Sequence, residues 1–85
     1  MSASVLVRVV PFARIREIVG EAVFLCEQRE GGTAGELWSE LAREFPALAP
    51  LERATRFVRN GAFVDRLAVL RDGDELALLP PYGGG

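Results

Sequence analysis

The sequence predicts an α+β domain in which a mixed sheet of four to five strands is covered on one face by one main helix. Two observations carry this prediction. Several short runs are rich in β-branched and aromatic residues, and turn dipeptides separate them, whereas a single segment combines a helix start signal with a helical apolar stripe. At 85 residues the chain is expected to be one domain over residues 1–85, because folding hides only about 60% of the surface of so small a chain.

The first strand is expected over residues 4–10, "SVLVRVV", where valine dominates and Arg8 marks the wetter face. In "PFARIREIVG", residues 11–20, apolar residues recur at helical spacing and Gly20 can end a helix, so we expect about two helical turns or a structured loop. A second strand is expected over residues 22–27, "AVFLCE".

The main helix is predicted in "GGTAGELWSELAREFP". Thr33 and Glu36 form the pattern of a capping box, and Pro46 ends the helix. Its apolar stripe consists of Leu37, Trp38, Leu41, Ala42 and Phe45. The "PALAPLE" segment that follows, residues 46–52, is expected to have little regular structure.

A β-hairpin is predicted around Asn60-Gly61, the preferred dipeptide for a two-residue turn. The register that follows pairs Arg59 with Ala62, Val58 with Phe63, Phe57 with Val64 and Arg56 with Asp65. The second and fourth of these pairs share a face, so we expect an opposite-charge pair beside an apolar one.

The last strand is expected over residues 75–79, after a turn at Asp72-Gly73, and Pro80 and Pro81 end its ladder. The first and last strands are the most apolar, so they are best placed side by side in the centre of the sheet, a β-grasp arrangement. Alternation then directs one set of side chains to the helix, Val5, Val7, Val9, Leu76 and Leu78. It directs a second set to the open face, Leu6, Arg8, Val10, Ala77 and Leu79.

The open face of the predicted sheet is unusually apolar for a free monomer, since Val58 and Phe63 of the hairpin also lie on it. One interpretation is that the "PALAP" segment covers part of this face. The interpretation we favour is a docking patch for a partner protein, because contiguous exposed apolar area beside charged residues marks an interface.

The chain closes on "PPYGGG", which we expect to be a flexible tail over residues 80–85. Its reach is about 20 Å at 3.3–3.6 Å per residue, enough to enter a deep pocket of another protein. Glycines keep it thin and leave the terminal carboxylate as the functional group, which needs activation, for example by attachment of AMP. The alternative is a frayed terminus or an expression remnant.

Composition excludes several function classes. The net charge is −2, and the ten basic residues, all arginine, are dispersed along the chain, which argues against nucleic acid as a partner. No apolar run reaches the roughly 20 residues of a membrane span, and the start does not resemble a signal peptide, so a cytoplasmic protein is expected. The chain has no histidine, and its single cysteine, Cys26, is interpreted as a structural residue. We therefore expect no metal site and no catalysis by the isolated chain.

Two stretches, "FARIREIVG" and "DGDELALLPPYGGG", resemble the MoaD family, the small subunits of molybdopterin synthase, within the ubiquitin-like β-grasp sulfur carriers (MoaD/ThiS). The resemblance runs essentially end to end and implies a sulfur carrier that binds no cofactor itself. A ubiquitin-activating-type, MoeB-like enzyme would use ATP to adenylate Gly85, and a sulfur donor such as a cysteine desulfurase would replace AMP to give a thiocarboxylate. The tail would then enter a MoaE-type large subunit in a heterotetramer and give its sulfur to the pterin precursor.

The site residues divide into two groups. Gly84 and Gly85 match the family's reactive terminal pair. The residues expected to contact partners, from the resemblance or from their place on the open face and tail, are Phe12, Arg16, Val58, Phe63, Leu79, Pro80, Pro81, Tyr82 and Gly83. The sequence departs from the family pattern at Tyr82-Gly83, and Leu78-Leu79 replaces a common aromatic pair, so the departures bear on partner identity more than on carrier chemistry.

Three alternative functions remain open at this point. The chain could carry sulfur for thiamine, cysteine or tRNA pathways. It could be a ubiquitin-like modifier joined through Gly85 to lysines of target proteins; it has no lysine itself, which excludes polymers linked through its own side chains. It could also be a binding module whose tail has no chemical role.

Overall fold

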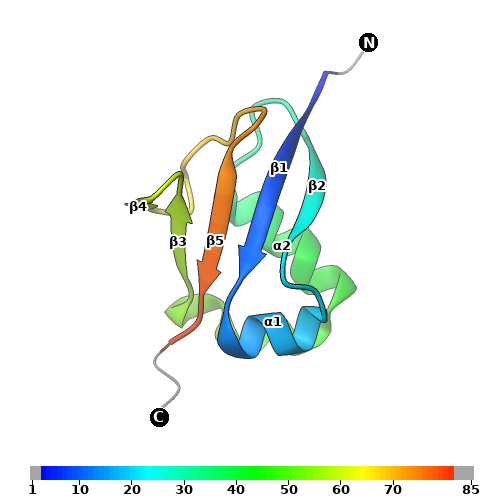
Figure 1. The fold of residues 1–85 in the computed structure, drawn as a ribbon, viewed down its shortest axis with the longest axis vertical. Helices are drawn as coiled ribbons and strands as arrows, with labels where there is room; N and C mark the ends of the chain where they lie inside the picture. The colour runs from blue at the N-terminus through cyan, green and yellow to red at the C-terminus, as the bar shows by residue number, and fades with distance from the viewer. Residues whose placement is uncertain (1–2, 82–85) are drawn as a thin grey trace.

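The computed structural model describes residues 3–81, which form one five-stranded mixed sheet with helices on one face (Figure 1). The elements in chain order are β1 (Ser4–Pro11), α1 (Ala13–Val19), β2 (Phe24–Arg29), α2 (Ala34–Glu44), the 3-10 helix η1 (Pro46–Ala54), β3 (Arg56–Arg59), β4 (Ala62–Val64) and β5 (Glu75–Leu79). The second strand therefore begins two residues later than predicted and extends to Arg29. None of the helices within residues 3–81 has the length and apolarity that crossing a bilayer requires.

The sheet has the strand order β2-β1-β5-β3-β4, which places the first and last strands side by side. Figure 1 shows β1 and β5 next to each other with their arrowheads pointing the same way, while α2 lies behind them. They pair in parallel, with Val9 opposite Leu76, and every other strand pair is antiparallel. The predicted β-grasp arrangement is confirmed.

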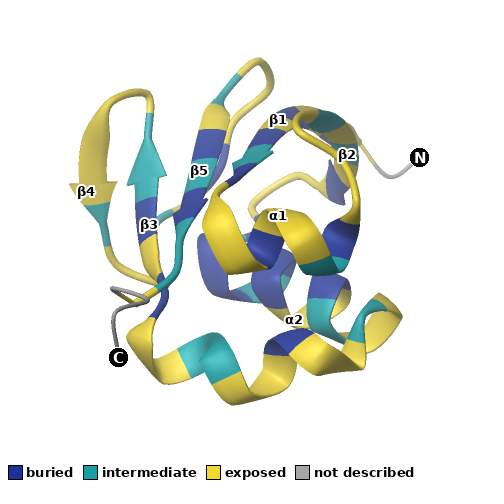
Figure 2. Cartoon of the chain, turned by 60° about the horizontal axis from the view of Figure 1, so that its bottom comes forward, coloured by how far each residue is buried: buried dark blue, intermediate teal, exposed yellow. Residues whose placement is uncertain are grey.

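The core lies between the sheet and α2, as the alternation of the strands predicts. All five side chains expected on the helix side are buried, and Val7, Val9, Leu76 and Leu78 are completely inaccessible. Trp38 of α2 packs edge-on against Phe57 of β3, with ring centroids 6.3 Å apart and an interplanar angle of 69°. In Figure 2 buried residues alternate with exposed or half-buried ones along β1 and β5.

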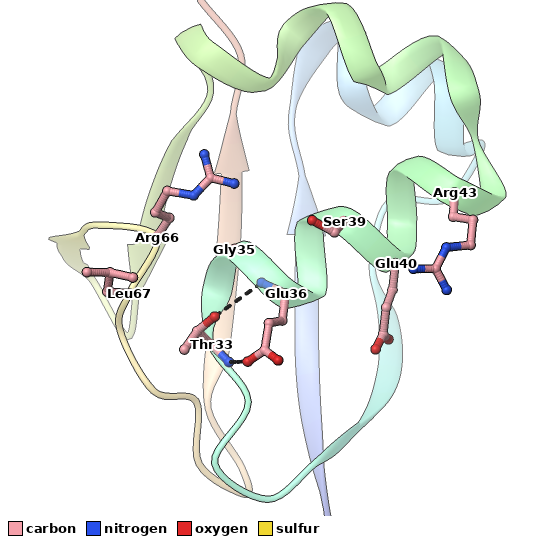
Figure 3. A pocket seen from close by; sticks show the side chains of 8 residues that line it. All are labelled: Thr33, Gly35, Glu36, Ser39, Glu40, Arg43, Arg66 and Leu67. Atoms are coloured by element: carbon pink, nitrogen blue, oxygen red, sulfur yellow. Dashed lines mark hydrogen bonds between the residues drawn. The ribbon is translucent and has the colours of Figure 1, made fainter.

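The predicted capping box at the start of α2 is present. The Glu36 amide donates to the Thr33 hydroxyl at 3.2 Å, and the Thr33 amide donates to the Glu36 carboxylate at 2.9 Å (Figure 3). The hydrogen bond that Arg29 donates to Glu36, at 2.7 Å, is the main reason that the pKa of Glu36 is lowered, and the Thr33 amide adds to it. The Arg29 contact joins the end of β2 to the first turn of α2, whereas the Thr33 contact lies within the cap of α2.

Replacing Thr33 by alanine is expected to lower the free energy of unfolding by about 1 kcal/mol, because the substitution removes the side-chain acceptor of the cap. Urea denaturation of Thr33→Ala and of the control Ser39→Ala measures this, since Ser39 is an exposed residue in the middle of α2. Equal midpoints for the two variants would show that the cap contributes nothing to stability.

Residues 46–54 correct one prediction. The segment expected to lack regular structure forms the 3-10 helix η1, in which Thr55 closes the last turn by donating its hydroxyl hydrogen bond to the Leu51 carbonyl at 2.7 Å. The helix η1 packs against α2 and α1 and buries Leu48 in the core. The segment therefore completes the helical layer, which overturns the alternative that it covers the open face.

The hairpin has the predicted register at three of its four pairs, with Asn60 and Gly61 at positive φ of 50° and 87°. The fourth pair, Arg56 with Asp65, was wrong. The strand β4 ends at Val64, and the Asp65 carboxylate turns to accept a hydrogen bond from the Leu67 amide at 2.8 Å. Arg56 instead lies over the ring of Phe63, with 5.8 Å from its guanidinium carbon to the ring centroid.

The Asp72–Glu75 stretch ties β5 to both of its neighbours. The Asp72 carboxylate accepts a hydrogen bond from the Leu6 amide of β1 at 2.8 Å. The Asp74 carboxylate accepts from the Arg71 amide and from the Asn60 side chain, each at 2.8 Å, so it links this turn to the hairpin turn. Burial acts to raise the pKa of Asp74, but these hydrogen bonds and nearby arginines outweigh it and the pKa is lowered. This part of the family motif is structural, because it fixes where β5 begins.

Candidate partner-binding site at the end of the last strand

An apolar row crosses the open face of the sheet from β1 to β4. Val10 pairs with Ala77, Ala77 pairs with Val58, and Val58 pairs with Phe63, so four strands each place one apolar side chain in the row. The first three residues are half-buried, whereas Phe63 is 67% exposed. The row is the part of the predicted apolar open face in which the apolar side chains are direct neighbours across the strands.

Two further apolar residues extend the row toward the end of β5. Leu79 is the last residue of β5, and Phe12 follows β1 directly beside it, where the Phe12 amide donates to the Leu78 carbonyl at 3.1 Å. Phe12 is 45% exposed. We call the six residues together the exit patch: Val10, Phe12, Val58, Phe63, Ala77 and Leu79.

A charged boundary separates the exit patch from the rest of the open face. Arg8 of β1 and Glu75 of β5 lie opposite each other and form an exposed ion pair at 3.6 Å. Leu25, 66% exposed, lies level with this pair because it is the partner of Arg8 on β2, and Leu6, 49% exposed, lies beyond the pair but opposite Glu27. The continuous apolar area is therefore confined to the half of the sheet from which the chain leaves β5.

The exit itself begins with Pro80, which is half-buried, and Pro81, which is exposed. A groove of about 590 Å³ opens beside it. Its walls come from the end of η1, the start of β3, the middle of β4, the end of β5 and the two prolines that follow. The residues are Arg53, Ala54, Thr55, Arg56, Phe63, Leu79, Pro80 and Pro81. The groove thus shares Phe63 and Leu79 with the exit patch.

The structure brings most of the predicted partner-binding residues together. Phe12, Val58, Phe63 and Leu79 lie in the exit patch, and the two prolines follow directly. Arg16 is exposed on α1, one turn after Phe12, since its amide donates to the Phe12 carbonyl at 3.3 Å. The predicted residues Tyr82, Gly83, Gly84 and Gly85 lie outside the described residues.

Sequence reasoning missed two residues of this region, Arg53 and Arg56. Arg53 was assigned to no predicted element, and Arg56 was paired with Asp65. In the structure both arginines line the groove at the exit. The signal that finds Arg56 is the pairing of β3 with β5, which places it opposite Leu79.

A second hollow, of about 360 Å³, lies along α2 (Figure 3). Its lining includes the polar side chains of Thr33, Ser39 and Arg43 of the α2 region together with Arg66. Arg66 is already engaged in an ion pair with Glu52. None of the residues that line this hollow belongs to the exit patch.

The Cys26 thiol lies in a half-buried position of β2 that faces α2. Burial raises its pKa above the usual value of 9.0, and the nearby carboxylates of Glu40 and Glu44 raise it further. Since the thiolate is the nucleophile, this environment lowers the reactivity of Cys26 at neutral pH relative to that of a free thiol. The structural role assigned to it from the sequence stays a prediction.

Alkylation of Cys26 by iodoacetamide at pH 7.5 is expected to be several-fold slower in the folded chain than in the denatured chain. The rate should rise as the pH exceeds 9.0, the usual thiol pKa. Because the folded-state pKa is the higher one, the stability that the protonated thiol contributes is complete below that pH and is lost above it. Equal rates in the folded and denatured chains would show that the thiol is not shielded.

The chain matches the family model described as the ThiS family over residues 9–85. It is 34% identical over 82 residues to the molybdopterin synthase sulfur carrier subunit of Homo sapiens, covering 93% of each chain. It is 31% identical over 84 residues to the subunit of the same name from Arabidopsis thaliana, covering 99% of this chain and 88% of the relative.

Solved structures with the same fold include a small archaeal modifier protein, a subunit of a molybdopterin-converting factor and a ubiquitin. The crystal structure of SAMP1 from Haloferax volcanii superimposes with a TM-score of 0.80 at 26% identity, covering 94% of this chain and 99% of the other. A complex of subunits 1 and 2 of the molybdopterin-converting factor from Helicobacter pylori contains a chain that matches with a TM-score of 0.64 at 28% identity, with coverage of 94% and 99%.

The ubiquitin of Caldiarchaeum subterraneum matches with a TM-score of 0.67 at 19% identity, covering 98% of this chain and all of the other, so it supports the fold alone. The predicted ubiquitin-like β-grasp is therefore confirmed. Since the family model covers nearly the whole chain, and relatives above 30% identity cover it equally fully, this chain belongs to the ThiS family, and its named relatives are sulfur carrier subunits of molybdopterin synthase.

Proposed function

We propose that this chain is the sulfur carrier subunit of a molybdopterin synthase and that the Gly85 carboxylate carries the sulfur as a thiocarboxylate. The observation that carries the proposal is the position of the exit patch. Its apolar side chains lie on the open face beside the end of β5, from which the sequence continues through Pro80-Pro81 to three glycines. A partner that binds this patch receives the tail at the same time.

The chemistry required at Gly85 explains why the chain depends on partners. A carboxylate is a poor electrophile, so ATP must first convert it to an acyl-adenylate with release of pyrophosphate. The terminal sulfur of a persulfide on the donor then attacks the carbonyl carbon and AMP leaves. A second thiol reduces the resulting acyl disulfide, which releases the thiocarboxylate and leaves a disulfide on the thiol partners. The chain has no histidine or lysine to act as acid or base, so the activating enzyme, of the ubiquitin-activating, MoeB-like type, must supply those groups. A cysteine desulfurase is the donor we propose.

We propose that the thiocarboxylated chain binds a large subunit of the MoaE type. The Helicobacter pylori complex supports this assignment, because its subunit 1 and 2 pairing includes a chain with the same fold. A deep pocket in the partner would also exclude water from the thiocarboxylate. The acceptor of the sulfur is then a pterin precursor, and the assembly expected from the family is a heterotetramer.

A second candidate function is attachment of this chain to other proteins through Gly85. The similarity to SAMP1, a small archaeal modifier protein by name, favours it. The same acyl-adenylate would serve both functions, and the outcomes differ in the nucleophile that attacks. A lysine amine gives an isopeptide bond, whereas sulfur gives a thiocarboxylate. Carriers for thiamine, cysteine or tRNA pathways differ only in the final acceptor.

Intact mass spectrometry tests the proposal directly. The chain is incubated with the activating enzyme and sulfur donor of its source organism, with and without ATP, and its C-terminal peptide is then mapped. The proposal predicts a mass gain equal to exchange of one oxygen for one sulfur, located at Gly85 and dependent on ATP. A branched conjugate to a target lysine would identify a modifier, and an unchanged terminus would contradict both functions.

A further inference from the structure

We infer that the groove beside the exit binds a carboxylate-bearing segment of the large subunit, held by Arg53 and Arg56. This inference rests on the proposed function and deepens it, because it gives the chemistry of the partner surface that lies next to the tail. We call this groove, with the eight lining residues given above, the basic groove.

The two arginines reach the basic groove from different elements. Arg53 is an exposed residue near the end of η1, and Arg56 is an exposed residue at the start of β3. Arg56 is held in place, since its guanidinium lies 5.8 Å from the centroid of the Phe63 ring. A guanidinium stacked on an aromatic ring still presents its N–H donors at its edge, where a carboxylate can accept two hydrogen bonds.

The acidic side chains nearest to the groove are already engaged. Glu52 forms an ion pair with Arg66, and Asp65 accepts a hydrogen bond from the Leu67 amide. Within residues 3–81, neither Arg53 nor Arg56 takes part in an ion pair. The two positive charges are therefore available to a carboxylate from outside the described residues.

The basic groove is continuous with the exit patch. Both contain Phe63 and Leu79, so a partner that covers the apolar row also approaches the two arginines. An interface with an apolar centre and charged residues at its rim is the usual arrangement for protein partners, and the rim charges act mainly on the rate and the choice of partner. An acidic segment next to the tail-binding pocket fits this arrangement.

The charges around the groove favour a protein carboxylate over a nucleic acid. Glu52 and Asp65 line the adjoining hollow that shares Arg53, Arg56 and Phe63 with the groove. The chain as a whole carries a net charge of −2. A polyanion would meet these negative charges along its length, whereas a segment with one or two carboxylates meets fewer of them.

The test measures binding of the full chain to the large subunit of the same organism by stopped-flow and calorimetry. The double variant Arg53→Glu with Arg56→Glu is expected to bind at least about tenfold more weakly, mainly through a slower association rate. Arg53→Lys with Arg56→Lys keeps the charge and should recover most of the association rate. Arg43→Glu, at an exposed residue of α2, changes the net charge as much as the single variant Arg53→Glu and is its matched control. It should bind within about twofold of the parent chain.

Added salt should weaken binding of the parent chain more than that of the double glutamate variant. Ions screen the attraction between the two arginines and the partner carboxylates, and the variant lacks this attraction. Equal affinities for the parent and the double variant would overturn the inference, and so would displacement of the large subunit by a single-stranded oligonucleotide competing for the arginines. The ATP-dependent mass gain of the parent chain separates the two proposals. A parent chain that gains sulfur and binds the large subunit leaves the proposed function standing even when the groove inference fails.

A parent chain that neither gains sulfur nor binds the large subunit would contradict the proposed function, and the groove inference would fail with it. The singly substituted Arg53→Glu variant guards against misfolding, since Arg53 lies outside the Arg56–Phe63 contact, and it should show part of the same loss.

Discussion

Deletion of Gly84 and Gly85 is expected to abolish sulfur transfer completely and to leave the fold and thermal stability unchanged. The proposal places the reacting carboxylate on Gly85, and the described core ends at Leu78, so the deletion removes the chemistry without removing packing. The shortened tail would also place its new carboxylate about 7 Å short of the position reached by the full tail. Reconstituted synthase activity and thermal denaturation measure the two effects.

The matched control for this deletion is removal of Met1 and Ser2, which takes the same number of residues from the other end of the chain. The strand β1 begins at Ser4, so this variant should retain activity. Activity in the chain that lacks Gly84 and Gly85 would contradict the carrier function and would favour a binding module whose tail has no chemical role.

Replacement of Trp38 by alanine is expected to lower the free energy of unfolding by about 3–5 kcal/mol. Trp38 is 1% exposed and packs against the Phe57 ring, so the substitution leaves a large cavity between α2 and the sheet. Total stabilities of small domains are about 5–15 kcal/mol, so the variant should be partly unfolded at 37 °C. Urea denaturation measures the loss, and Trp38→Phe should recover most of the packing.

The control for Trp38→Ala is Phe63→Ala. Phe63 is 67% exposed in the exit patch, so its truncation should change stability by less than about 0.5 kcal/mol while it weakens binding to the large subunit. A Phe63→Ala chain as unstable as Trp38→Ala would contradict the assignment of the two faces of the sheet.

Local rules predict most of this fold because its elements obey them without conflict. The capping box at Thr33 sets the start of α2, and Asn60-Gly61 sets the hairpin register. The 3-10 helix η1 was missed because Pro46 and Pro50 disfavour an α-helix, whereas a 3-10 helix that begins with proline and buries Leu48 accommodates both. The end of β4 at Val64 is set by the following turn, which no pairing rule reveals.

The apolar half of the candidate site could also be predicted, because alternation along β1 and β5 decides which side chains face the helix. The charged half could not. Arg53 and Arg56 meet at the exit only because η1 leads directly into β3, and because β3 pairs with β5 so that Arg56 lies opposite Leu79. The role of Asp72 and Asp74 was likewise hidden in the sequence, since their partners Leu6 and Asn60 lie on other elements.

The most direct test of the account is a single-turnover transfer from the thiocarboxylated chain. The thiocarboxylated chain is mixed with the large subunit and the pterin precursor, and the masses of protein and pterin are followed together. The account predicts that the protein returns to the mass of its carboxylate form as sulfur appears on the pterin, in step and without a protein conjugate. Retention of sulfur on Gly85, or attachment of the chain to a lysine of another protein, would contradict the proposed synthase function.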